Sequence, residues 1–288
     1  MSIVCSIHMP RTGKQKYVRT TLSTSQITLL DLVYKYRFVS RQLVAESLGI
    51  TFGSSLYGRF EVLVKYGYLA KRFEKHMKLL NAPVAYYVTP KGLKALQALP
   101  DHEAITDTTI KTSYKDKSVG QTFINHTLDV YQYTNLLKHH HKGLKVFTRR
   151  DIARYDYFPD QLPDAFLSLP TNDPQQPRRF FFDIVPTLTP RYVTDRRIAQ
   201  YCEFFDEGGW DSTESEFPII LLVSESGAAE KRLQRSVRAQ LNRSDMEEEL
   251  AVYTSTMAAV ANMTSDAPIW TSVEDTDELT TLDSIVTP

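Results

Sequence analysis

The chain has 288 residues, of which 42% are hydrophobic, 11% aromatic and 24% charged, a composition typical of a soluble globular protein rather than a disordered or fibrous one. No apolar run approaches the roughly 20 residues of a membrane-spanning helix. The two cysteines, Cys5 and Cys202, cannot form a disulfide framework. We therefore expect a cytoplasmic protein without a membrane partner.

The zero net charge conceals three regions of different charge. Residues 1–100 hold 15 Lys and Arg against four Asp and Glu, which gives +11. Residues 101–244 give −1, and residues 245–288, with ten acids and no base, give −10. A basic segment of this size favours a polyanionic partner such as nucleic acid.

The first hundred residues combine short helices with a basic hairpin. Residues 1–24 are basic and aperiodic, which predicts a flexible arm. Ser40 and Gly49 have the positions of an N-cap and a left-handed C-cap around the second helix. By apolar spacing and turn residues, the expected elements are helices over about 25–38, 40–49, 54–67 and 91–99, and strands over 68–73 and 85–89.

This order of elements predicts a winged helix-turn-helix over residues 25–100. In such a domain the third helix enters a DNA major groove and the hairpin follows the phosphate backbone. Hydroxyl and basic side chains suit phosphate and base-edge contacts. The candidate DNA-binding residues are Ser54, Ser55, Tyr57, Arg59, Lys71, Arg72, Lys75 and Lys78. The alternative is a winged helix used for protein contact, with solvated basic residues.

The second half predicts an α/β domain. Residues 101–120 are polar and aperiodic, which indicates a linker, and residues 261–288 are acidic and rich in Thr, Ser and Asp, which indicates a mostly disordered acidic tail. Between them, over 121–260, we expect an α/β domain, so the whole chain is predicted to be α+β and multidomain. Its expected helices cover 121–142, 194–206 and 228–241, and its strands 144–148, 165–169, 180–185, 217–224 and 250–254.

Two acidic residues in this domain could carry chemistry. Asp164 lies just before one predicted strand and Asp183 at the end of the next. Such a pair can share a divalent metal through oxygen ligands, as in PD-(D/E)xK nucleases. Those sites add a lysine two residues after the second acid, where this chain has Val185. Arg197 on the following helix could supply the cation, but a guanidinium stays charged and cannot act as a base. Two ordinary surface aspartates would give the same spacing.

Several segments resemble the replication-relaxation family, which is associated with plasmid replication and mobilisation. The resemblance runs from about residue 25 to 240 and is carried by LLDLVYKYRFVSRQLVAESLG, YYVTPKGLKAL, LPDAFLSL, RRFFFDIVPT and DRRIAQYCEFF. It implies a winged helix joined to a PD-(D/E)xK-like domain.

The family pattern also implies particular site residues. Members commonly show Pro-Asp before a strand, which Pro163-Asp164 matches, and then an acid-x-acid on the next strand. Asp183 matches the first acid, but Val185 stands in place of the second. A basic residue followed by a tyrosine on the next helix is matched by Arg197 and Tyr201.

These observations together predict a double-stranded DNA-binding protein of a mobile element, acting in replication, mobilisation or their regulation. Its nuclease-like domain is predicted to be catalytically inactive and to need no cofactor. The protein's expected partner, besides DNA, is a relaxase, a replication protein or a second copy of the chain. One alternative is an Mg²⁺-dependent endonuclease or nickase that uses Asp164, Asp183 and Arg197. Another is a protein-interaction adaptor. The acidic tail could also fold back and compete with DNA for the basic residues 1–100.

Overall fold

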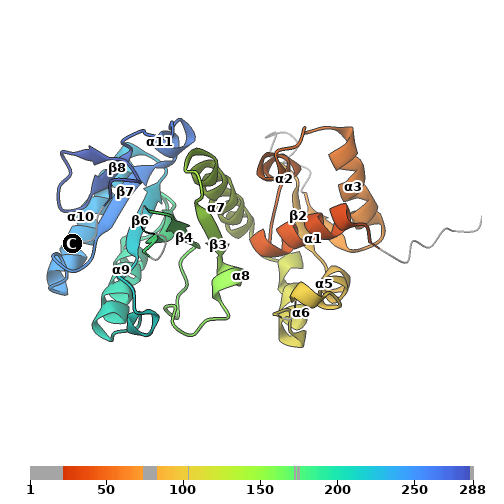
Figure 1. Ribbon diagram of the computed structural model, residues 1–288, viewed down its shortest axis with the longest axis horizontal. Coiled ribbons are helices and arrows are strands. Elements are labelled where there is room, and N and C mark those ends of the chain that lie inside the picture. The colour runs from red at the N-terminus through yellow and green to blue at the C-terminus, as the bar shows by residue number, and fades with distance from the viewer. Residues whose placement is uncertain (1–21, 74–82, 103, 172, 174–175, 286–288) are drawn as a thin grey trace, which may run out of the picture.

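The computed structural model describes residues 22–73, 83–102, 104–171, 173 and 176–285 (Figure 1). These residues form an α+β structure, as predicted, with a two-stranded sheet in the N-terminal part and a seven-stranded mixed sheet in the C-terminal part. No helix in this part of the chain is long and apolar enough to cross a membrane.

The described residues of the N-terminal part include helices and a hairpin close to the predicted positions. They are α1 (Thr24–Tyr36), α2 (Arg41–Leu48), α3 (Ser54–Lys65), β1 (Leu69–Arg72), β2 (Ala85–Val88) and α5 (Pro90–Gln97). The predicted caps of α2 are present: the hydroxyl of Ser40 accepts a hydrogen bond from the Leu43 N–H at 3.2 Å, and Gly49 has φ 61°. Helix α1 begins slightly earlier than predicted, because Ser23 and Gln26 form a capping box.

One apolar core holds these elements together. Leu30, Val33 and Phe60 are fully buried in it, and β2 contributes Tyr86. Strands β1 and β2 pair antiparallel, and an isolated bridge joins Val39 to Tyr86. The segment between α1 and α2 therefore lies along the hairpin, and this contact fixes the position of α2 and α3 beside it.

We predicted that residues 101–120 form a linker, but the described residues of this range contain regular helical structure. They contain α6 (Asp107–Thr112) between the 3₁₀ turns η1 (Pro100–His102) and η2 (Ser113–Lys117). Ile105 and Ile110 pack in the N-terminal core. Asp116 is only 2% exposed and pairs with Arg37 at 2.7 Å and with Arg150 at 3.8 Å. Ion pairs to distant residues help to hold this segment. Such contacts leave no apolar period in the local sequence, which is why the pattern indicated a linker.

The C-terminal part is built on the seven-stranded sheet, whose order is β3-β4-β5-β6-β7-β8-β9. Strands β5, β6 and β7 are parallel, and the other pairs are antiparallel. The elements are α7 (Gln121–His140), β3 (Lys145–Thr148), α8 (Arg149–Ile152), β4 (Ala165–Leu169), β5 (Arg178–Val185), α9 (Arg191–Asp206), η3 (Asp211–Thr213), β6 (Ile219–Ser224), α10 (Gly227–Arg243), β7 (Val252–Thr256), α11 (Met257–Ala261), β8 (Trp270–Ser272) and β9 (Leu279–Thr280).

Helices cover both faces of this sheet. On β5, Phe180 and Phe182 belong to the core beneath α7 and α11, while Phe181 belongs to the core beneath α9 and α10. Because side chains alternate along a strand, Asp183 shares the face of Phe181. Helix α9 lies over that face, since the ring of Tyr201 stacks on Phe181 with centroids 5.3 Å apart. The alternation therefore places Asp183 beneath α9.

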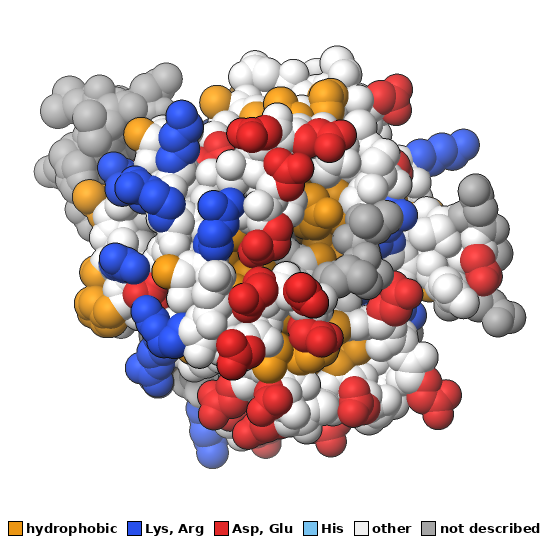
Figure 2. Space-filling model, turned by 90° about the vertical axis from the view of Figure 1, so that its left-hand side faces the viewer, with side chains coloured by type: hydrophobic (Ala, Val, Ile, Leu, Met, Phe, Trp, Pro, Cys, Tyr) orange, Lys and Arg blue, Asp and Glu red, His pale blue; other side chains and the backbone are white. Residues whose placement is uncertain are grey.

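The acidic C-terminal segment is folded as far as Ile285, so its predicted disorder is wrong for the described residues. Trp270, Leu282 and Ile285 are buried in the core beneath α7, and β8 pairs with β7. This segment lies at the end of the molecule opposite α3 (Figure 1), where acidic side chains gather on the surface (Figure 2). The placement contradicts a tail that folds back over α3 of its own chain.

Candidate functional site

The structure brings the two predicted acids together. Strands β4 and β5 pair antiparallel with Ala165 opposite Phe182, which sets Asp164 beside Asp183. The backbone N–H of Asp164 donates to Asp183 Oδ1 at 2.9 Å, and the N–H of Ile184 donates to Asp164 Oδ2 at 3.0 Å. Both aspartates are buried, so neither is an ordinary surface carboxylate.

Helix α9 supplies two further partners of Asp183. Arg197 donates from Nε to Asp183 Oδ2 at 3.0 Å and from Nη2 to Oδ1 at 3.2 Å. Tyr201 lies four residues later on the same face of the helix, and its hydroxyl donates to Asp183 Oδ2 at 2.7 Å. Arg197 also donates to this hydroxyl and to the Gln161 carbonyl. The basic residue and the tyrosine that the family resemblance indicated therefore both bind the same carboxylate.

The charges in this cluster reinforce one another. Burial alone would raise the pKa of Asp183, but the Arg197 guanidinium, the Tyr201 hydroxyl and the Asp164 N–H together hold that pKa below its usual value. Burial and the charge of Asp183 raise the pKa of Tyr201 well above its usual value. An ionised Asp183 therefore accepts hydrogen bonds from a charged Arg197 and a neutral Tyr201.

His126 of α7 completes the cluster on the side of Asp164. Its Nε2 lies 2.9 Å from Asp164 Oδ2. Burial lowers the pKa of His126, but the hydrogen bond and the charge of Asp164 outweigh burial and raise it overall. The identity of its partner depends on where β4 crosses α7, and no local pattern around His126 indicated it.

This arrangement does not fit a bound Mg²⁺. Both oxygens of Asp183 already accept hydrogen bonds, from two guanidinium nitrogens, a hydroxyl and a backbone N–H. Within the described residues, no group of three or more His, Cys, Asp and Glu side chains could hold a metal ion. A cavity of about 240 Å³ adjoins Asp164, Asp183 and Arg197, so a metal could approach, but Arg197 would first have to leave Asp183.

The predicted DNA-binding residues of α3 are accessible. Ser54, Ser55 and Tyr57 are exposed on its first turn, and Arg59 is half-buried. The N-cap residue of α3 is Gly53, which makes no side-chain capping bond, so the described residues leave the first backbone N–H groups of α3 uncapped. Arg41 of α2 lies with its guanidinium carbon 4.6 Å from the Tyr57 ring centroid. Sequence reasoning missed Arg41, because its place beside α3 depends on how the two helices cross.

Some hairpin residues that we predicted to bind DNA instead contact other parts of the protein. Lys71 pairs with Glu61 at 3.4 Å. Arg72 donates to the carbonyl of Lys117 at 3.0 Å, which fastens the hairpin to η2. Lys75 and Lys78 lie outside the described residues. Of the four basic hairpin residues that we predicted to bind DNA, Arg72 is thus directed toward the protein itself.

The chain is an α+β protein that joins a helical segment with a hairpin to a mixed sheet. A family model described as replication-relaxation matches residues 30–220, which are 191 of the 288 residues. The protein therefore belongs to the replication-relaxation family, as the sequence resemblance indicated. No curated protein and no solved structure matched it.

Proposed function

We propose that this protein binds double-stranded DNA through the start of α3 and the adjoining hairpin, in the replication or mobilisation of a mobile element. The order α1-α2-α3-β1-β2 and the Val39–Tyr86 bridge support a winged-helix domain. In such a domain α3 is the recognition helix. Membership of the replication-relaxation family supports the biological setting.

The observation that carries this proposal is the chemistry of the exposed surface at the start of α3. Two hydroxyls, Ser54 and Ser55, and uncapped N–H groups stand beside the guanidinium of Arg41. These are the groups that bind phosphate oxygens. They belong to a segment with a charge of +11 over residues 1–100, which favours association with DNA over long range.

The test is fluorescence anisotropy of a labelled random duplex with the full chain. We expect Arg41→Gln to weaken binding several-fold, because one phosphate contact is lost. Lys94→Gln is the matched control, since it removes the same charge from an exposed site on α5. Equal affinities of the two variants would contradict the assignment of α3, and no binding at low salt would favour the protein-interaction adaptor.

For the C-terminal domain we infer a nuclease-like fold without catalytic activity. The order α7-β3-β4-β5-α9-β6 supports this fold, and the saturation of Asp183 by Arg197 and Tyr201 supports inactivity. The juxtaposed acids favour an Mg²⁺-dependent endonuclease or nickase as the second candidate. Nicking of supercoiled plasmid that requires Mg²⁺ and is lost in Asp183→Asn would establish the nuclease, and intact plasmid supports the inactive domain.

A further inference from the structure

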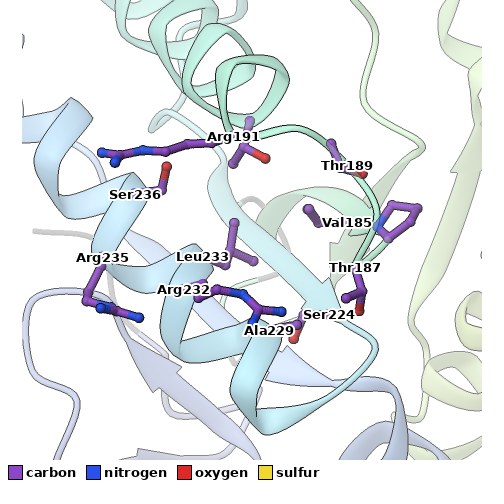
Figure 3. Close-up of a pocket in the computed structure, with 12 residues that line it drawn as sticks. Val185, Thr187, Thr189, Arg191, Ser224, Ala229, Arg232, Leu233, Arg235 and Ser236 are labelled. Carbon is purple, nitrogen blue, oxygen red and sulfur yellow. The ribbon is translucent and has the colours of Figure 1, made fainter.

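A larger cavity lies at the carboxyl ends of β5 and β6, between α9 and α10 (Figure 3). Its volume is about 530 Å³, within the range of about 300–1,000 Å³ typical of small-molecule sites. It shares Val185, Pro186, Thr189 and Thr194 with the cavity of the acid pair, but neither Asp164 nor Asp183 lines it. The proposed DNA-binding surface of α3 does not contribute to it.

Eight of the twelve residues that line this cavity have basic or hydroxyl side chains, and none of the described lining residues is a carboxylate. Three arginines line it: Arg191, Arg232 and Arg235. Five hydroxyl side chains contribute as well: Thr187, Thr189, Thr194, Ser224 and Ser236. Hydroxyl and guanidinium groups are both hydrogen-bond donors, so the set suits an anionic ligand rich in oxygen acceptors.

The fold explains why these groups converge. Parallel strands β5 and β6 end at the same edge of the sheet, and α9 and α10 begin near that edge, where ligands of α/β proteins commonly bind. Arg191 is the first residue of α9. Arg232 and Arg235 are three residues apart on α10 and therefore share one side of that helix. In Figure 3 Arg191 extends over Ser236, and Arg232 extends toward Ser224 and Thr187.

Some of these arginine and hydroxyl side chains already have partners among the described residues, and others do not. Asp195, which adjoins the cavity, pairs with Arg191 at 3.5 Å and accepts a hydrogen bond from Ser236. Arg232 makes no ion pair with any residue that the structure describes. Arg232 is exposed, so its guanidinium is open to a ligand that enters the cavity.

We propose that this cavity binds a terminal phosphate group, from a free nucleotide or from the phosphorylated end of a DNA strand. Several arginines around one small cavity match the paired oxygens and the double charge of a phosphomonoester. A terminal phosphomonoester presents three oxygens and a second negative charge that an internal phosphodiester lacks, so the arginines favour a terminal group.

The test uses fluorescence anisotropy of a labelled single strand with either a 5′-phosphate or a 5′-hydroxyl, and calorimetric titration with AMP. The variant is Arg232→Gln in the full chain. The matched control is Lys231→Gln, which removes the same charge from the neighbouring exposed residue, outside the cavity. Circular dichroism and thermal melting of both variants verify that they are folded.

We expect a phosphomonoester to bind and Arg232→Gln to weaken it by about tenfold or more, as for loss of a charged hydrogen bond, while Lys231→Gln leaves it unchanged. Preference for the 5′-phosphorylated strand assigns the ligand to DNA ends, and binding of AMP alone assigns it to nucleotides. The proposal is overturned if neither probe binds, or if both variants bind equally. Because α3 is unaltered, a blunt 5′-hydroxyl duplex tests its DNA binding separately.

Discussion

Replacing Asp183 by asparagine separates a structural ion pair from a metal centre. The substitution keeps the shape of the side chain but removes the charge that faces Arg197, whose side chain is only 17% exposed. Leaving one member of a buried ion pair without its partner costs about 3–5 kcal/mol. In addition, the NH₂ group of the asparagine would face the N–H groups of Arg197 or the hydroxyl of Tyr201, which now donate hydrogen bonds to Asp183. We therefore expect the free energy of unfolding to fall by about 3 kcal/mol.

A metal centre predicts the opposite sign. Two neighbouring carboxylates that wait for a cation repel each other, so neutralising one would leave the metal-free protein equally stable or more stable. The assay is urea unfolding at pH 7 with linear extrapolation. Asp160→Asn is the control, because Asp160 is exposed nearby, and surface substitutions change stability by less than about 0.5 kcal/mol.

A double-mutant cycle with Arg197→Met measures the coupling directly. We expect the double variant to lose much less stability than the sum of the single losses, with an interaction free energy within the roughly 0.5–3 kcal/mol of residues in contact. Additive losses would show that Arg197 and Asp183 do not act as a pair. An Asp183→Asn protein at least as stable as the unmodified chain would refute the structural reasoning, as would stabilisation by Mg²⁺ that this substitution abolishes.

Two further predictions concern His126 and Trp270. The folded-state pKa of His126 is raised, so its stabilising contribution is full below its unfolded pKa of about 6.5 and is lost as the pH rises through the folded value. Urea unfolding from pH 6 to 8 should therefore show a decline in stability that is smaller in His126→Gln, and parallel profiles would contradict the link to Asp164. Trp270→Ala should lower the free energy of unfolding by about 3–5 kcal/mol, since Trp270 is fully buried, whereas a disordered tail would tolerate it without change.

Local patterns predicted much of the fold because they report local physics. The residues Ser40 and Gly49 marked the ends of α2 by their capping chemistry. Asp164 and Asp183 lie side by side because the consecutive strands β4 and β5 pair antiparallel. Arg197 joined them because α9 covers the face of β5 that carries Asp183.

The features that were missed depend on distant partners. Residues 113–117 are held by Asp116, whose ion pairs reach Arg37 and Arg150, so no periodic apolar signal marks them. Trp270 is buried through the pairing of β8 with β7, although acidic and hydroxyl residues surround it in the sequence. The arginine-lined cavity likewise combines α9 and α10, and spacing within either helix cannot place the other.

The central claim is that the start of α3 binds duplex DNA through phosphate contacts. Its most direct test is the affinity of the full chain for a random duplex, measured by anisotropy between 50 and 200 mM salt, a range over which a protein with several phosphate contacts loses affinity steeply. We predict such a steep linear fall of log affinity with log salt, and a slope shallower by about one in Arg41→Gln. An affinity that does not depend on salt, or a slope that Arg41→Gln leaves unchanged, would contradict the account.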